Sequence, residues 1–454
     1  MLVRKYCAYD AAITWRVHRI QSSGIKTDGL TKLYQSQRQV LSTLIDIEHR
    51  GIHVDPVSVI ALRKQLAARV KRLEKRFQAT MEKLSYPPVL MSSAQQLSTL
   101  LYSEMRFTPQ KRTPKGVPSV DKSAIPALYP QVEEIADILG TTRSTIRTVL
   151  DSIIETRGLK KMISTYLDGI AERVHDEHVH ANFNLTGTVT GRLSSSRPNM
   201  QNIPRDATAP IKQIFTAVPK HFLIAADYSQ IELRIGAYLT RDANMLQLLR
   251  SGADLHTETA RQICGREPSK EERSRAKTVN FGVFYGMGMK ALAEKEQMTE
   301  QAALRFIRAW HRAFPAVKRW QKEQEETLKQ DGYVSSPFGR RRRFNLAAMA
   351  NEADYAHAVR QACNFPVQSM ASELTLLAMA KVNTVAPVIL NVHDSIMVQV
   401  PKRGWKKVAK EIREVMEDVD GLVKTFGWSM TIDVPIRVDL QVGECWANLE
   451  NYYW

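Results

Sequence analysis

The chain has 454 residues, enough for about three structural units of roughly 150 residues each, with ordinary hydrophobic (44%) and charged (24%) fractions that argue against a disordered or collagen-like protein. Its four cysteines (Cys7, Cys264, Cys363 and Cys445) lie far apart, which argues against a disulfide framework or a zinc site. The formal charge of +17 predicts a polyanionic partner, nucleic acid rather than a membrane, and no apolar run is long enough to span a bilayer.

The first part of the chain is predicted to be mainly helical. Residues 1–40 indicate a short helical piece that cannot bury a core by itself. A strongly basic helix is expected over 57–84, because Asp55 is a plausible N-cap and Pro56 would occupy the first helical position. Its basic side chains are compatible with a solvated face or with a nucleic-acid contact. Residues 108–120, rich in proline and basic residues, predict a flexible basic loop.

Short strands and polar loops are predicted after residue 180. The apolar run 222–226 indicates a buried strand that ends at Asp227. Two β-rich runs, 388–392 and 396–400, flank His393-Asp394-Ser395 and predict a hairpin with polar residues at its tip. The remaining expectations are a strand over 179–184, a polar loop over 186–201, mostly helices over 240–360, a helix over 403–418 and strands near 430–442.

Asp227 and Asp394 are the first candidates for chemistry. If the strands that precede them pair in one sheet, both carboxylates could project at the same end. Mg²⁺ is commonly held by one or two carboxylates plus substrate phosphates, and two such ions about 3.5–4 Å apart can drive phosphoryl transfer. An acid at the end of a strand can equally be an ordinary turn residue, so the pair alone leaves both interpretations open.

A second pattern is a stripe in which Arg273, Lys277, Phe281 and Tyr285 recur every four residues. On a helix these side chains form one slowly winding row, cationic at its start and aromatic at its end. The row suits a triphosphate beside a stacked base. An amphipathic helix with its aromatic residues in a core and its cations in water would show the same spacing.

Three segments resemble the polymerase motifs of the DNA polymerase I family (family A). They are DYSQIELR (227–234), RSRAKTVNFGVFYG (273–286) and VHDS (392–395). Further segments, TGRLSSSRPNMQNIP (190–204), PFGRRR (337–342) and RQACNFPVQ (360–368), resemble the family in the same order. The resemblance covers roughly 41–454. One departure is Ser395, which follows Asp394 where the family usually has Glu.

The resemblance implies an α+β right-hand polymerase fold: a palm with an antiparallel sheet, helical fingers and a helical thumb. The implied units are a remnant of the end of a 3′–5′ exonuclease-like domain (1–40), the thumb (41–172), the first part of the palm (173–239), the fingers (240–351) and the second part of the palm (352–454).

The resemblance also implies a template-directed, primer-dependent DNA polymerase that adds dNTPs to a 3′-hydroxyl by two-metal-ion nucleotidyl transfer, in replication or repair. Asp227, Asp394 and the Tyr228 carbonyl would bind two Mg²⁺ ions, for which Mn²⁺ could substitute, and Lys277 would be a further catalytic residue on the triphosphate. The implied nucleotide-binding residues are Arg273, Lys277, Phe281, Tyr285, His256, Gln230 and Glu232, the last as a steric gate against a 2′-hydroxyl. The implied DNA-binding residues are Arg192, Gln201, Asn202, Arg360, Asn364, Gln368 and His393, and the Arg340–Arg343 run is also expected to meet nucleic acid.

Two alternatives remain. His-Asp-Ser is also familiar from single-subunit RNA polymerases, although the bulky acid Glu232 argues against RNA synthesis. A catalytically silent DNA-binding protein is the other alternative, although binding alone would not need both Asp227 and Asp394.

The expected partners are a DNA primer–template and dNTPs. Tyr6 and Asp10 resemble the last motif of the proofreading exonuclease domain that precedes the polymerase in this family, although they could also sit on an ordinary helix by accident. The earlier acidic motifs would lie before Met1, so we expect no intrinsic proofreading and either a truncated chain or a separate exonuclease or other replication proteins. We expect a monomer without a membrane partner, acting in the cytoplasm (nucleoid-associated, or in the host cytoplasm if the chain is viral).

Overall fold

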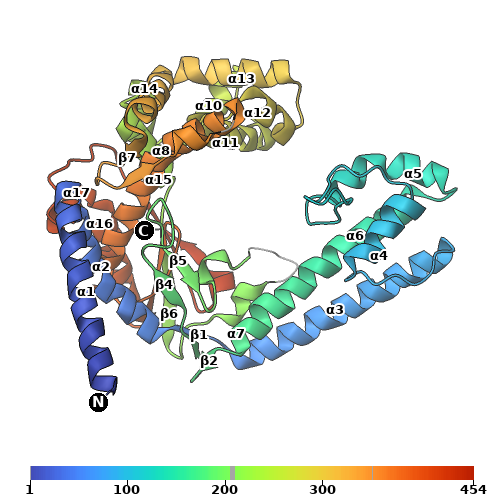
Figure 1. The fold of residues 1–454 in the computed structure, drawn as a ribbon, viewed down its shortest axis with the longest axis horizontal. Helices are drawn as coiled ribbons and strands as arrows, with labels where there is room; N and C mark the ends of the chain where they lie inside the picture. Colours follow the sequence, from blue (N-terminus) through green and yellow to red (C-terminus); the bar gives the residue numbers. More distant parts are fainter. Residues whose placement is uncertain (1, 205–209, 350, 454) are drawn as a thin grey trace.

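A five-stranded antiparallel sheet lies at the centre of the computed structural model, which describes residues 2–204, 210–349 and 351–453 (Figure 1). The strand order is β12-β11-β6-β10-β9, so strands from distant parts of the chain lie side by side. The predicted hairpin is confirmed as β9 and β10. The strands are β6 (His221–Tyr228), β9 (Val388–Val392), β10 (Ser395–Pro401), β11 (Val438–Gly443) and β12 (Glu450–Tyr452).

The central strand β6 is apolar because both of its faces are covered. Ile224, Ala226 and Tyr228 point into the larger hydrophobic core, whereas Leu223 and Ala225 belong to a second core on the other face. Side chains alternate along a strand, so Asp227 emerges on the face of Leu223 and Ala225. The buried strand that the sequence predicted is therefore confirmed, and its acid lies at the exposed end.

Helices cover the face of the sheet that carries the larger core. The long helix α15 (Glu352–Val382) is almost wholly buried in its second half and packs against β9 and β10. Helix α2 (Thr31–Arg50) packs on α15 and β9 as one continuous element, so the domain boundary expected after residue 40 falls inside this helix. The other helices around α15 are α8 (Ile231–Thr240), α16 (Trp405–Glu417) and α17 (Val419–Thr425).

A group of helices rises from the end of the sheet at which Asp227 lies (Figure 1). Its interior is aromatic: Trp310 and Phe314 have ring centroids 5.2 Å apart, and Phe284 lies 6.4 Å from Trp310. These rings hold the group together by burying large apolar surfaces. We call this group the helical cap. It comprises α9 (Ala243–Arg250), α10 (Leu255–Cys264), α11 (Lys270–Phe284), α12 (Met289–Glu296), α13 (Glu300–Ala313) and α14 (Pro315–Asp331).

An arm of residues 56–161 extends away from the sheet (Figure 1). It is formed by α3 (Pro56–Lys83) packed along α6 (Arg143–Lys161). The predicted start of α3 is confirmed, because the Asp55 carboxylate accepts hydrogen bonds from the amides of Val57 and Ser58. A separate hydrophobic core fills the tip. The tip elements are α4 (Ala94–Ser98), η1 (Thr99–Glu104), η2 (Pro126–Gln131) and α5 (Val132–Ile138).

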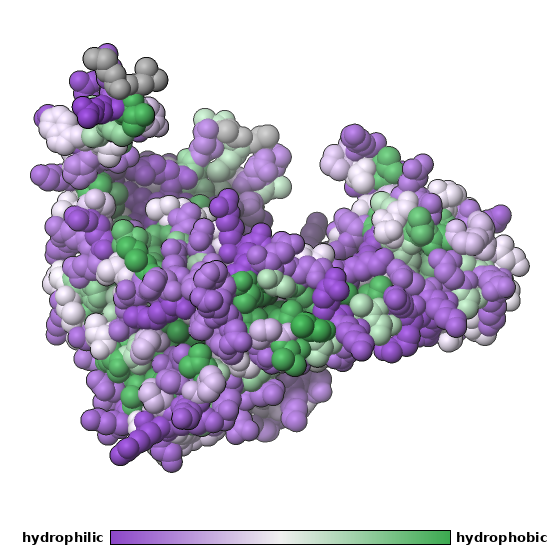
Figure 2. Space-filling model, turned by 90° about the horizontal axis from the view of Figure 1, so that it is seen from below, coloured by the Kyte–Doolittle hydropathy of each residue, from purple (hydrophilic) through white to green (hydrophobic). Residues whose placement is uncertain are grey.

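The remaining elements are short, apart from the exposed helix α1 (Leu2–Thr27). They are η3 (Met162–Asp168) and α7 (Gly169–Ala171), the sheet β1 (Ile52–His53), β2 (Val174–His175) and β3 (His178–Val179), and the hairpins β4 (Asn182–Asn184) with β5 (Ser194–Ser196) and β7 (Tyr333–Ser335) with β8 (Arg341–Arg343). The last are four short 3₁₀ helices, η4 (Met200–Asn202), η5 (Ile211–Ile214), η6 (Leu346–Ala348) and η7 (Trp446–Asn448). Seen from below, hydrophilic residues cover most of the sheet region and the arm (Figure 2), and no helix among the described residues is long and apolar enough to cross a bilayer.

Two local expectations need correction. The strand predicted over 179–184 is interrupted, because β3 ends at Val179 and β4 begins at Asn182. The strands predicted near 430–442 reduce to β11, and residues 430–437 have no regular structure. The Arg340–Arg343 run has partners within the protein: Arg340 binds Glu373, Arg342 binds Gln361, and Arg341 and Arg343 bind Asp28. The Arg343 side chain is still 62% exposed, and the contact of this run with nucleic acid stays a prediction.

Candidate active site

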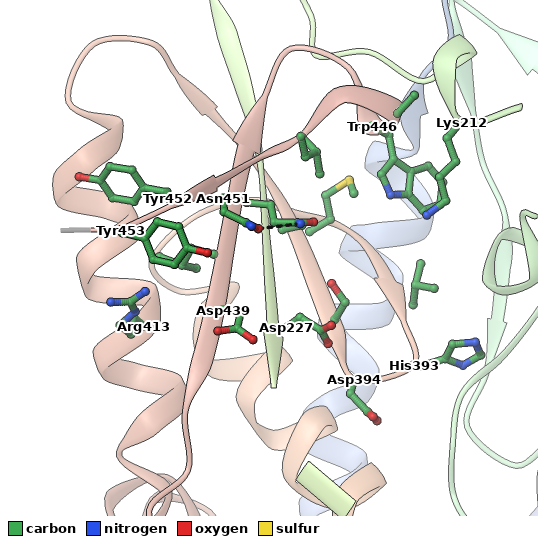
Figure 3. A pocket seen from close by; sticks show the side chains of 18 of the residues that line it. Lys212, Asp227, His393, Asp394, Arg413, Asp439, Trp446, Asn451, Tyr452 and Tyr453 are labelled. Atoms are coloured by element: carbon green, nitrogen blue, oxygen red, sulfur yellow. Dashed lines mark hydrogen bonds between the residues drawn. The ribbon is translucent and has the colours of Figure 1, made fainter. Parts of the chain in front are cut away.

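The sheet brings three carboxylates to one end. Asp227 at the end of β6 lies directly opposite Ser395 of β10 on one side and Asp439 of β11 on the other. Directly opposed residues of an antiparallel pair project on the same face. Asp227, Asp394 and Asp439 accordingly line one cavity, and Figure 3 shows them at the same end of the sheet. Sequence reasoning found the first two residues but missed Asp439.

Asp394 occupies the tight turn between β9 and β10. His393 adopts a left-handed backbone with φ of 55°, and the side-chain amide of Asn391 donates to the carbonyls of His393 and Ser395 at 3.3 and 3.1 Å. The Asp394 carbonyl also accepts from the Tyr228 amide at 3.2 Å. These bonds fix the turn against β6, so the position of Asp394 relative to Asp227 does not depend on a flexible loop.

The electrostatics at Asp394 suit a bound cation. Burial raises the pKa of this carboxyl to about 6, and Glu232 and Asp227 push it in the same direction, whereas Arg192 lowers it. A divalent cation would relieve the repulsion between these acids. No group of three or more His, Cys, Asp or Glu side chains arranged to hold a metal is found among the described residues. Two carboxylates nevertheless fit Mg²⁺, which takes its remaining oxygen ligands from water and substrate phosphates.

Glu232, in the first turn of α8, is held on both of its oxygens. Arg192 Nη2 lies 2.6 Å from Glu232 Oε1, and the Tyr285 hydroxyl donates to Oε2 at 2.5 Å. The same Arg192 Nη2 is 3.9 Å from Asp394 Oδ1. This run of contacts connects the end of α11 to the carboxylate end of the sheet, and it brings together residues from four separate sequence segments (190–204, 227–234, 273–286 and 392–395).

The stripe on α11 lies on the less buried face of that helix. The helix starts with a capping box between Ser269 and Glu272. Arg273 and Lys277 are exposed, and Phe281 and Tyr285 are half-buried against the main core. The opposite face packs fully inside and consists of Ala276, Val279, Asn280, Val283 and Phe284. The aromatic end of the stripe therefore contributes to the core and still borders the site.

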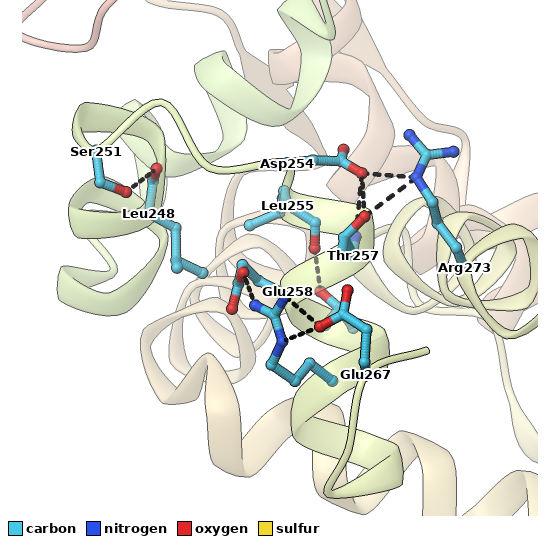
Figure 4. A network of polar contacts seen from close by, with 10 residues as sticks. Leu248, Ser251, Asp254, Leu255, Thr257, Glu258, Glu267 and Arg273 are labelled. Atoms are coloured by element: carbon cyan, nitrogen blue, oxygen red, sulfur yellow. Dashed lines mark hydrogen bonds and ion pairs between the residues drawn. The ribbon is translucent and has the colours of Figure 1, made fainter. Parts of the chain in front are cut away.

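Arg273 is oriented by Asp254, the N-cap residue of α10 (Figure 4). Arg273 Nε lies 2.7 Å from Asp254 Oδ2, and the Gln230 amide approaches Oδ1 at 3.4 Å. The two terminal nitrogens of the guanidinium point away from Asp254 (Figure 4). Hydrogen bonds from Thr257 and Arg273 lower the pKa of Asp254 to about 2 despite its partial burial. The carboxylate is therefore ionised at neutral pH and leaves one edge of Arg273 available for an anion.

His256 follows Asp254 by two residues but is almost fully buried, with 3% of its surface exposed. Its Nδ1 lies 2.9 Å from the Asn280 amide nitrogen, and its ring centroid is 5.7 Å from that of Phe281. Burial lowers its pKa to about 4, helped by Arg273 and Lys277 and opposed by Asp254. The imidazole is consequently neutral at physiological pH.

The predicted DNA-binding residues fall into two groups. Arg360, Asn364 and Gln368 recur every four residues along α15, and they are exposed or half-buried on a helix that is otherwise mostly inside. A second group, Arg192, Gln201 and His393, borders one small cavity next to Asn391. Asn202 is exposed, and its carbonyl accepts from the Tyr166 hydroxyl at 2.9 Å.

Two of these residues carry buried polar atoms, Arg192 Nε and Asn364 Oδ1, that have no hydrogen-bond partner within the described part of the chain. Leaving such atoms unpaired costs free energy, so both are suited to a ligand that supplies the missing partner.

The sequence profile of DNA polymerase family A matches residues 58–448. The thermostable DNA polymerase I of Thermus filiformis is 35% identical over 437 residues, which cover 93% of this chain and 49% of that protein. The DNA polymerase I of Bacillus caldotenax is 30% identical over 463 residues, or 98% of this chain and 49% of that protein. The chain thus spans about half the length of the curated relatives it matches.

A solved structure described as the POL domain of Pol1 from M. smegmatis, in complex with DNA primer-template and dNTP, is similar in fold. It has a TM-score of 0.77 and 27% sequence identity, and the match covers 90% of this chain and 70% of that one. The similarity agrees with the expected α+β right-hand polymerase architecture.

Proposed function

This chain belongs to DNA polymerase family A, and we propose from that premise that it is a template-directed, primer-dependent DNA polymerase. In this proposal the five-stranded sheet and α15 form the palm, the helical cap (α9–α14) forms the fingers, and the arm of residues 56–161 forms the thumb. The substrates are dNTPs and a DNA primer with a free 3′-hydroxyl.

The observation that carries the proposal is the run of contacts from Tyr285 through Glu232 and Arg192 toward Asp394. It puts the cationic and aromatic stripe of α11 next to the carboxylates of the sheet. Nucleotidyl transfer needs this combination, because the triphosphate, the reacting phosphorus and the primer end must be held together. A protein that only binds DNA would not need it.

Asp227 and Asp394, with the Tyr228 carbonyl, are the residues that would hold two Mg²⁺ ions. When bound, these ions stabilise negative charge on the attacking and leaving oxygens. Arg273 and Lys277 provide positive charge for the triphosphate, which carries dispersed negative charge as the phosphoryl bond breaks. Phe281 and Tyr285 offer apolar surfaces to the base and sugar. The Glu232 carboxylate occupies space that a ribose 2′-hydroxyl would require.

DNA contacts are assigned to both the sheet region and the arm. Lys64, Lys71 and Lys75 are exposed at spacings of seven and four residues, so they share one face of α3. Such lysines suit sequence-independent contacts with phosphates. Arg192, Asn364 and Gln368 are suited to the primer–template close to the reacting end, where their polar groups can find partners on the bases and sugars.

We further propose that the 454 residues alone do not remove a mismatched primer end. Asp10 is exposed on α1, and a single carboxylate is a poor basis for a two-metal hydrolytic site. In this view proofreading would depend on residues outside these 454 or on a separate exonuclease, and the chain would act as a monomer on cytoplasmic DNA in replication or repair.

Primer extension on a recessed DNA template tests the proposal. The wild-type chain is incubated with Mg²⁺ and either dNTPs or rNTPs, beside Asp227→Asn and Asp433→Asn; the latter removes an acid that pairs with Arg241 and Arg250 away from the site. We expect extension with dNTPs only, lost in Asp227→Asn and kept in Asp433→Asn. Extension with rNTPs would assign RNA synthesis instead. Tight DNA binding without any extension would identify a silent binding protein.

A further inference from the structure

A fully buried side-chain amide connects three helices of the cap. Asn280 on α11 has no exposed surface. Its Oδ1 lies 2.7 Å from the indole Nε1 of Trp310 on α13, and its Nδ2 lies 2.9 Å from His256 Nδ1 on α10. The Leu255 carbonyl is 3.5 Å from the same Nδ2.

The partners of Asn280 determine which way its amide points. The Trp310 indole can only donate a hydrogen bond, so the atom that faces it must be the amide oxygen. The Leu255 carbonyl can only accept, so the atom that faces it must be the amide nitrogen. Thr259 Oγ1 lies 3.0 Å from Asn280 Oδ1, but its one hydroxyl hydrogen also has the Leu255 carbonyl as an acceptor at 2.7 Å, so this contact does not decide the orientation. The contacts with Trp310 and Leu255 therefore require the same orientation of the Asn280 amide.

This orientation determines the protonation state of His256. The Asn280 nitrogen carries only donors, so His256 Nδ1 must accept, and the proton of the neutral ring must be on Nε2. A doubly protonated ring would bring an Nδ1–H against the amide N–H₂ group. Burial also disfavours the cationic ring. The positive charges of Arg273 and Lys277 act in the same direction, Asp254 acts against them, and the pKa of His256 is about 4.

We propose that Asn280 is a positioning residue that holds His256 as the Nε2–H tautomer, so that this ring offers a neutral hydrogen-bond donor to the triphosphate of an incoming nucleotide. The identity of that ligand rests on the proposed function. Among the described residues His256 Nε2 has no hydrogen-bond partner. Arg273 and Lys277 then provide the positive charge, and His256 adds a directed donor that does not change with pH in the physiological range.

Two-bond ¹H–¹⁵N correlation spectra of the whole chain with ¹⁵N-labelled histidine test the tautomer directly. The chain has 11 histidines, and the signals of His256 are identified by their loss in His256→Gln. We expect the Nε2–H pattern from pH 8 to pH 5, with a shift of Nε2 when dATP is added. An Nδ1–H pattern or a cationic ring at pH 7 would overturn the inference.

Two variants test whether Asn280 is the cause. Asn280→Asp keeps the shape but replaces the donor with an acceptor, so we expect a proton on Nδ1, a raised His256 pKa and a KM for dNTPs that changes at least threefold with a smaller change in kcat. Trp310→Phe removes the indole N–H together with part of a fully buried ring, so its folded state is checked by circular dichroism, and we expect a mixture of tautomers. Asn351→Asp, at the exposed N-cap of α15, is the matched control, because Asp also caps helices well.

An unchanged Nε2–H pattern in both Asn280→Asp and Trp310→Phe would contradict the role of Asn280. The spectra need no catalysis, so they separate this inference from the proposed function. If the wild-type chain fails to extend a primer, the proposed function fails and the tautomer result stands. If the wild-type chain extends a primer while His256 has the other tautomer, only the present inference fails.

Discussion

The Tyr285 hydroxyl donates a 2.5 Å hydrogen bond to Glu232, which joins the end of α11 to the start of α8. Burial, followed by the neighbouring Glu232 charge, raises the pKa of Tyr285 well above its usual value. The hydroxyl therefore stays protonated and can donate throughout the working pH range. With Arg192 on the other oxygen, the carboxylate has little freedom to turn away from the site.

Glu232→Ala is expected to relax discrimination against ribonucleotides. Removing the carboxylate opens space for a 2′-hydroxyl, and pocket contacts of this size change selectivity by roughly 10- to 200-fold. The measurement is the ratio of kcat/KM for a dNTP and the matching rNTP. Tyr285→Phe, which removes only the hydroxyl that holds Glu232, should give a smaller effect in the same direction. Unchanged selectivity in Glu232→Ala would show that this residue is not the gate.

Asp254→Asn is expected to weaken dNTP binding through Arg273. The variant exchanges a charged partner of Arg273 Nε for a neutral one, so the guanidinium is held less firmly, and we expect KM to rise by about 3- to 10-fold with less change in kcat. Glu258→Gln is the control, since Glu258 lies on the same helix but pairs with Arg261. The double variant with Arg273→Ala should show no additional loss beyond Arg273→Ala. Independent, additive losses would disprove the coupling.

His256 is expected to make the fold sensitive to acid. Its pKa is about 4 in the folded protein and near 6.5 when unfolded. Between these values the unfolded chain binds more protons, so the free energy of unfolding falls as pH decreases from 6.5 toward 4. From pH 7 to pH 5 the loss from this one group is about 2 kcal/mol.

Urea unfolding at pH 7 and pH 5 measures this effect. The loss of stability on acidification should be smaller in His256→Gln than in the wild type. It should be unchanged in His357→Gln, which alters an exposed histidine on α15. Equal pH dependence in His256→Gln and the wild type would mean that this ring is not held neutral by the fold.

Asp439→Asn is expected to reduce the rate of nucleotide addition and to raise the Mg²⁺ concentration needed for half-maximal activity. Asp439 lies directly opposite Asp227 on the same face of the sheet, so its charge adds to the negative potential there. We expect a loss of about 10-fold, smaller than that of a direct ligand. The measurement is a Mg²⁺ titration of single-nucleotide addition. Full activity of Asp439→Asn at limiting Mg²⁺ would show that Asp439 does not belong to the site.

The parts of the fold that depend on local sequence were predicted well. The N-cap at Asp55, the apolar run before Asp227 and the hairpin around Asp394 all depend on neighbouring residues, and each is confirmed. The resemblance implied a separate role for each of Arg192, Glu232 and Tyr285. It did not indicate their mutual contacts, because these are made between distant segments of the chain.

The features that the sequence did not predict depend on the pairing of distant strands and on contacts between side chains far apart in the sequence. Asp439 follows an alternating pattern that marks it as exposed, but the pairing of β11 with β6 is what places it beside Asp227. The resemblance implied that His256 meets the nucleotide, yet nothing in the motif indicates that Asn280 buries and orients its ring. The ion pairs of the Arg340–Arg343 run with Asp28 and Glu373 could not be predicted, because these partners are far away in the sequence.

Single-turnover addition of one dNTP to a primer–template, with DNA affinity measured on the same samples, tests the central claim most directly. The claim is that Asp394 is part of the catalytic centre of a DNA polymerase. We predict that Asp394→Asn slows addition by about a thousandfold or more, while the Kd for DNA and the folded state measured by circular dichroism remain those of the wild type. Addition at the wild-type rate by a folded Asp394→Asn chain would contradict the account.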